Sequence, residues 1–102
     1  MNQTALPEWL QMLKERDPEF TETYLNQRDD VLKDGAIPAK YKILMTMIVD
    51  AVVAHPEGCA AIANRARAAG ATEAEITEAV EVAHMCGGTP ALVMAANAFR
   101  TS

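Results

Sequence analysis

The residues Ile43–Ala54, ILMTMIVDAVVA, decide how the rest of the chain must fold, because ten of these twelve residues are apolar. The segment is shorter than the roughly 20 apolar residues that a transmembrane helix needs. A helix that is apolar on every side is normally a buried one. We therefore expect a central helix that other helices cover. It should end at His55-Pro56, since the residue before a proline is disfavoured in the α conformation.

Outward from this segment, residues that start and end helices recur along the chain, and no stretch alternates apolar and polar residues as a strand would. Asp17-Pro18 is typical of an N-cap followed by the first helical residue, and Thr72-x-x-Glu75 is a capping box. Gly87-Gly88 should end a helix. The sequence predicts an all-α fold of about six helices, roughly over residues 7–16, 18–33, 38–54, 57–69, 72–87 and 90–101. We expect a single domain over residues 1–102, in which residues 1–36 form a helical hairpin.

The charge and alanine content limit the classes of partner. The net charge is −5 and no basic patch occurs, so nucleic acid and acidic membrane surfaces are not expected to bind. The first residues, MNQTALPEW, lack the features of a secretory signal, and the two cysteines suggest free thiols in a reducing cytoplasm. Nineteen alanines imply a core of small side chains with limited stability, which favours association between copies of the chain.

The run Gly70–Ala95, GATEAEITEAVEVAHMCGGTPALVMA, resembles the carboxymuconolactone decarboxylase and alkylhydroperoxidase-like family. The matching features are the A-G-A-T turn, the E-x-x-E-A-V helix and the G-G-x-P break before an apolar helix. The resemblance extends over about residues 37–99, which would be the family core. It implies an all-α fold around a central antiparallel helix pair and a homo-oligomer, commonly a trimer or hexamer.

The peroxidase branch of that family carries a C-x-x-C-x-x-x-H motif and a glutamate on the central helix, and this chain departs from both. An alignment without gaps places the two cysteines of the motif on His55 and Gly58, the histidine on Ile62 and the glutamate on Ile43. A dithiol cycle needs two thiols within reach of each other. Dithiol peroxidase chemistry is therefore not expected.

Four residues could carry chemistry. Cys59 falls in the first turn of a predicted helix, where the helix dipole lowers the pKa of a thiol, and His55 could act as its base; the alternative is a small core side chain. Asp50 is the single charge in the central segment and needs a partner, for function or for structure. His84 could contribute to the same pocket or bond a terminal carbonyl. Cys86, at the end of its helix, is expected to be core packing.

These residues leave three hypotheses. The first is a family member with a small-molecule pocket near Asp50, His55, Cys59 and His84, in which Cys59 is the thiol, His55 the base and Asp50 or His84 the proton partner. The second is a single-cysteine peroxidase or thiol oxidoreductase that uses Cys59. The third is a non-catalytic oligomeric binding subunit. No cofactor is expected, and the spacing of these residues matches no known set of metal ligands.

Overall fold

The computed structural model describes residues 6–100, and within that range the regular structure is entirely helical. Five α-helices follow one another: α1 (Glu8–Arg16), α2 (Pro18–Leu32), α3 (Ala39–Val52), α4 (Pro56–Ala68) and α5 (Glu73–Ala95). A short 3₁₀ helix, η1 (Ala96–Phe99), ends the described part of the chain. The all-α prediction is confirmed.

The chain forms two compact units, residues 1–33 and residues 34–102. The first contains α1 and α2, which pack against each other. Its helices meet at Asp17, whose carboxylate accepts a hydrogen bond from the Phe20 backbone N–H, so that Asp17 is the N-cap predicted for α2. The rings of Trp9 and Tyr24 meet edge to face, with 5.9 Å between their centroids, which adds one aromatic contact between the two helices.

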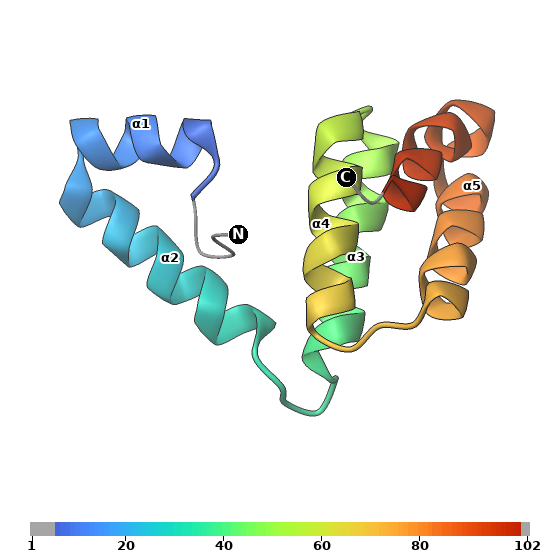
Figure 1. The fold of residues 1–102 in the computed structure, drawn as a ribbon, viewed down its shortest axis with the longest axis horizontal. Helices are drawn as coiled ribbons and strands as arrows, with labels where there is room; N and C mark the ends of the chain where they lie inside the picture. The colour runs from blue at the N-terminus through green and yellow to red at the C-terminus, as the bar shows by residue number, and fades with distance from the viewer. Residues whose placement is uncertain (1–5, 101–102) are drawn as a thin grey trace. The chain divides into compact units, whose positions relative to one another are not determined.

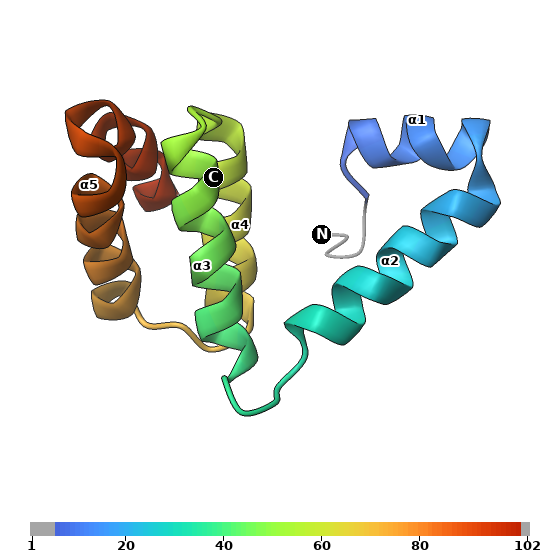
Figure 2. The ribbon, with the colours of Figure 1, turned by 180° about the vertical axis from the view of Figure 1, so that it is seen from behind.

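In the second unit, α3 is the central helix and packs against both α4 and α5, as Figures 1 and 2 show. The core that they share contains fourteen buried residues, and eight of these are alanines. Small side chains allow helix axes to approach closely but bury little area each. Ile76, Val80 and Ala83 of α5 face this core, as the sequence predicts.

The count of about six helices needs one correction, because the predicted fifth and sixth helices are both contained in α5, on either side of a kink. Gly88 lies at their junction with a φ of 75° and a ψ of −165°, outside the helical region, so regular helical geometry ends there and a second helical segment follows the kink. Pro90 then starts the next helical turn, where its missing N–H is not needed. The predicted break is therefore at the right place, but no separate loop follows it.

The expectation that the central segment is buried on every side is wrong for the single chain. Leu44, Met47 and Ala51 point into the core, whereas Met45 and Val49 on the opposite side of α3 are 49% and 59% exposed. A three-helix arrangement covers only one broad face of α3, because α4 and α5 both lie on that face. The segment is buried where it meets its neighbours and apolar where it meets solvent.

The stretch Glu73–Phe99 is the one stretch within residues 6–100 whose length and composition would allow it to cross a membrane. The inward face of this stretch forms the core with α3 and α4, and its first nine residues carry Glu73, Glu75, Glu78 and Glu81. The apolar window of this stretch is 28% buried within the single chain.

Candidate functional site

The junction between α3 and α4 brings Asp50 and His55 together. The helix α3 ends in a Schellman motif, in which the His55 N–H donates to the Asp50 carbonyl over 2.8 Å and the Ala54 N–H donates to the Ala51 carbonyl over 3.1 Å. Ala54 adopts the left-handed conformation that this motif requires, with a φ of 62°. This closure folds residue 55 back over residue 50.

His55 is also the N-cap residue of α4, so a single residue ends one helix and starts the next. Its backbone carbonyl accepts from the Cys59 N–H over 3.1 Å, the first hydrogen bond of α4. Pro56 follows as the first helical residue, where its fixed φ suits a helix start. The sequence therefore fixes the backbone on both sides of the His55 imidazole.

The side chains of this junction form an ion pair or hydrogen bond. The His55 Nδ1 lies 3.3 Å from the Asp50 Oδ2, and the two side chains are 60% and 25% exposed, respectively. A carboxylate accepts only, so in this arrangement the protonated Nδ1 donates a hydrogen bond to the Asp50 carboxylate. The other ring nitrogen, Nε2, is then left to meet a ligand. This is the arrangement of a histidine oriented by a carboxylate, which suits proton transfer.

Gly58, in the first turn of α4, lies directly beneath this pair. A Cβ atom at residue 58 would come within 1.9 Å of the Asp50 Oδ2 and 2.6 Å of the His55 Nδ1. Real Cβ atoms do not approach other atoms so closely. The pair can occupy its position because residue 58 has no side chain.

Cys59 points away from the pair into the core, where it is completely buried. Its thiol lies 3.8 Å from the Met47 carbonyl, to which it can donate a weak hydrogen bond. Burial raises the pKa of the Cys59 thiol, and the nearby charge of Asp50 raises it further. The expectation of a lowered pKa at this helix start is wrong, because desolvation outweighs the helix dipole when the sulfur is sealed from water. The catalytic role of Cys59 stays a prediction, and its environment counts against it.

The other two sequence candidates lie on α5. His84 and Cys86 are both exposed, so the prediction that Cys86 packs in the core is wrong. Within residues 6–100, His84 makes no hydrogen bond with Asp50, His55 or Cys59, although α5 approaches this end of α3. A Cβ at Gly87 would lie 3.3 Å from a methyl group of Val52, the last residue of α3. The proposed contribution of His84 to a pocket stays a prediction.

Charged side chains elsewhere in the second unit fasten the helices together. Arg67 donates to both carboxylate oxygens of Glu73, over 2.7 and 3.0 Å, and to the Ala98 carbonyl over 2.8 Å. This contact with Glu73 raises the pKa of Arg67 and lowers that of Glu73. Glu75 closes the predicted capping box with Thr72 and also bonds Lys40 and Tyr41 of α3. These contacts hold the helices in position and bring no second reactive cluster.

Sequence reasoning did not single out Gly58 as part of the site. Glycine in a first helical turn is a weak signal by itself, and the atoms that a side chain at residue 58 would strike are evident only in the folded chain. No cluster of three metal-ligating side chains occurs among the described residues, 6–100.

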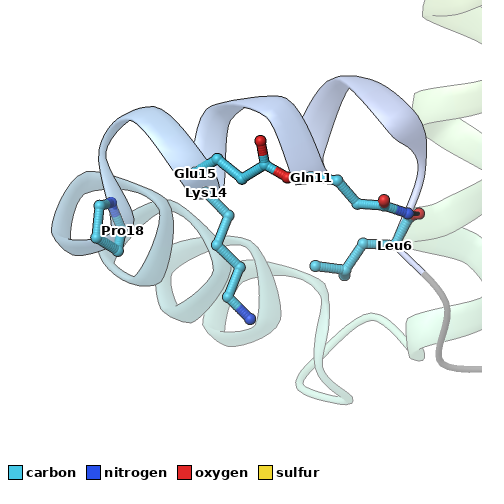
Figure 3. A pocket seen from close by; sticks show the side chains of 5 residues that line it. All are labelled: Leu6, Gln11, Lys14, Glu15 and Pro18. Carbon is cyan, nitrogen blue, oxygen red and sulfur yellow. Dashed lines mark hydrogen bonds between the residues drawn. The ribbon is translucent and has the colours of Figure 1, made fainter.

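A hollow in the first unit has a different character. It has a volume of about 530 Å³ and is lined by Leu6, Gln11, Lys14, Glu15 and Pro18. Figure 3 shows these side chains along α1 and the start of α2, with Gln11 bonded to the Leu6 carbonyl. The hollow is wide open, and its lining carries two charges of opposite sign, Lys14 and Glu15, but no cysteine, serine or histidine. The size of this hollow alone does not indicate a chemical role. The candidate site is therefore the junction of α3 and α4.

The comparisons with known proteins define the class of this chain. The model of the carboxymuconolactone decarboxylase family matches residues 18–101, so the chain belongs to that family. The match begins at Pro18, the first residue of α2, further towards the N-terminus than the resemblance over residues 37–99. No curated protein gives a significant match.

A solved structure agrees with this assignment. The chain is similar to the crystal structure of a protein from Burkholderia xenovorans LB400 that was assigned as a carboxymuconolactone decarboxylase. The two are 31% identical, the TM-score is 0.83, and the similarity covers 92% of this chain and 74% of the other. The family resemblance predicted from residues 37–99 is confirmed.

Proposed function

We propose that this protein is an enzyme that acts on a small molecule and uses the Asp50–His55 pair to transfer a proton. The proposed reaction is the decarboxylation of a small carboxylated lactone. The observation that carries the proposal is the pair itself. The His55 imidazole is partly exposed to solvent and is oriented by the Asp50 carboxylate. Backbone hydrogen bonds fix the junction of α3 and α4 on which both residues lie. The choice of reaction rests on the family and on the name of the similar protein from Burkholderia xenovorans LB400.

The proposed chemistry needs one acid. When the bond between the carboxylate carbon and the ring breaks, carbon dioxide leaves and the electron pair stays on the ring carbon. His55, protonated on both ring nitrogens, gives its Nε2 proton to that carbon, which completes the product, and the neutral ring then takes up one proton from the solvent. Asp50 holds the ring by Nδ1 and stabilises its charged form, which also attracts an anionic substrate.

The test is turnover of carboxymuconolactone by the purified protein, measured as release of carbon dioxide. Removing a general acid typically costs 10²–10⁴-fold in rate, so His55→Gln should lose about that factor. Asp50→Asn keeps the shape but removes the charge and should lose activity as well. Cys86→Ser, on the exposed surface of α5, is the matched control and should leave turnover unchanged.

The same proteins separate the other two hypotheses. If Cys59 is a peroxidatic thiol, peroxide consumption with a dithiol reductant should occur and should vanish in Cys59→Ala. If the chain is a binding subunit, a ligand should raise the melting temperature without being consumed. Full turnover by both His55→Gln and Asp50→Asn would refute the proposed mechanism.

We also propose that copies of the chain associate through the exposed apolar side of α3. Met45, Val49, Val52 and Val53 follow helical spacing along that side and are all exposed in the single chain. A homo-oligomer, a trimer or hexamer by the family resemblance, would cover them. Light scattering on a sizing column should show a smaller assembly for Val49→Lys than for the control Gln27→Lys on α2. An unchanged mass for Val49→Lys would count against this interface.

A further inference from the structure

We infer that Gly58 is a positioning residue for the Asp50–His55 pair: the absence of a side chain at residue 58 is what allows the Asp50 carboxylate to reach the imidazole. The inference rests on the proposed function for its meaning, because it concerns the same pair. Its physical basis is independent, because it concerns only which atoms can occupy one small volume.

The Asp50 carboxylate occupies the space that a side chain at residue 58 would need. Of the three atoms nearest to a Cβ built on Gly58, two are Asp50 Oδ2 and Cγ, at 1.9 and 2.9 Å. The third is the His55 Nδ1 at 2.6 Å. Each distance is below the 3.0 Å that real Cβ contacts keep, so a side chain at residue 58 must displace the carboxylate.

Neither the backbone nor helix stability demands glycine at this position. Gly58 is inside α4 and is not among the residues with a positive φ, so its conformation suits any residue. Alanine is a better helix former than glycine. A glycine that served the helix alone would therefore be improved by Gly58→Ala. Glycine lowers the stability of the helix here, and this loss is offset because the Asp50 carboxylate can then lie against residue 58 and reach His55.

This reasoning predicts a change of sign that depends on Asp50. In the native sequence Gly58→Ala should lower the melting temperature, because the methyl group and the carboxylate compete for one space. In Asp50→Ala the same change should raise the melting temperature by about 2–8 °C, the range expected for a better helix former in a small domain. His55 can turn away in that variant because its side chain is mostly exposed.

Two controls are needed. One separates the shape of the Asp50 side chain from its charge, and the other measures the effect of replacing a glycine elsewhere in the chain. Asp50→Asn retains the atoms that collide, so Gly58→Ala should still lower the melting temperature in that background. Gly35→Ala lies outside the helices and would place its Cβ 3.5 Å from the Lys42 Nζ, an ordinary contact. It should change the melting temperature little, whatever residue occupies position 50.

A functional readout completes the test. In the carbon dioxide assay Gly58→Ala should lower kcat as Asp50→Asn does and leave KM less affected, since the oriented proton is lost rather than the space for substrate. If the melting-temperature pattern holds and no variant releases carbon dioxide, the proposed reaction fails and the positioning role stands. If Gly58→Ala does not fold, recovery of a folded Gly58→Ala/Asp50→Ala protein supports the inference.

An equal effect of Gly58→Ala with and without the Asp50 side chain would overturn the inference. So would failure of both the single and the double variant to fold, because the defect would then be independent of Asp50.

Discussion

The two Schellman motifs of the second unit predict opposite effects for two opposite substitutions. At the end of α3 the left-handed position is Ala54, with a φ of 62°, and at the end of α4 it is Gly70, with a φ of 101°. The hydrogen bonds match: the Gly70 N–H donates to the Arg67 carbonyl over 3.0 Å, and the Ala71 N–H donates to the Ala66 carbonyl over 2.9 Å. The same backbone device thus carries alanine in one place and glycine in the other.

The magnitude follows from two competing terms. An L-residue in the left-handed conformation costs about 1–2 kcal/mol. Glycine avoids that cost but loses about 0.5–1 kcal/mol more conformational entropy on folding than alanine does. Ala54→Gly should therefore stabilise the protein by up to about 1 kcal/mol, and Gly70→Ala should destabilise it by a similar amount. For a domain of this size, 1 kcal/mol corresponds to about 4–8 °C in melting temperature.

Thermal and urea unfolding of both variants at one fixed protein concentration would measure these shifts, because association between copies changes apparent stability. The urea slope should stay constant, which would show that the folded state is unchanged. A loss of stability in Ala54→Gly together with no loss in Gly70→Ala would refute the reasoning, since the left-handed geometry would then carry no cost at either helix end.

Three further predictions follow from burial, charge and capping. A thiol reagent should modify Cys86 in the native protein and reach Cys59 only after unfolding, because Cys59 is sealed and its pKa is raised; Cys86→Ser should abolish the fast reaction. The Thr72 backbone N–H lowers the pKa of Glu75, with Lys40 adding to the effect. That stabilisation is present above the unfolded pKa of about 4.3 and is lost as pH falls through the lower folded pKa. Urea midpoints between pH 6 and 2.5 should fall less steeply in Glu75→Gln. Thr72→Ala removes the N-cap of α5 and should cost about 1 kcal/mol in urea unfolding; no change would contradict the cap.

The fold could be predicted from the sequence because short local motifs, such as capping residues, determine where its helices begin and end. Asp17 and the Thr72–Glu75 box cap the helices where expected, and Gly88 marks the turn of the chain. Local signals do not report how many neighbours a helix has. For that reason the sequence predicts a central segment covered on every side, whereas Val49 on the far side of α3 is exposed.

The candidate site could be predicted only in part, for a related reason. Asp50 and His55 are five residues apart, and a helix end followed by His-Pro makes their meeting possible from the sequence alone. The direction of a side chain depends on how a helix is rotated against its neighbours. Cys59 follows its helix start as predicted but points into the core, whereas Gly58 beside it faces the pair.

The double use of His55, as the last residue of one helix motif and the first cap of the next, leaves the connection between α3 and α4 without a spare residue. Chain length there is consequently as important as chain chemistry. One residue inserted between positions 50 and 55 would rotate the imidazole away from the carboxylate, even if every original side chain were kept. Engineers who wish to graft a tag or a sensor into this protein should avoid that junction and choose the longer connection between α2 and α3, residues 33–38, instead.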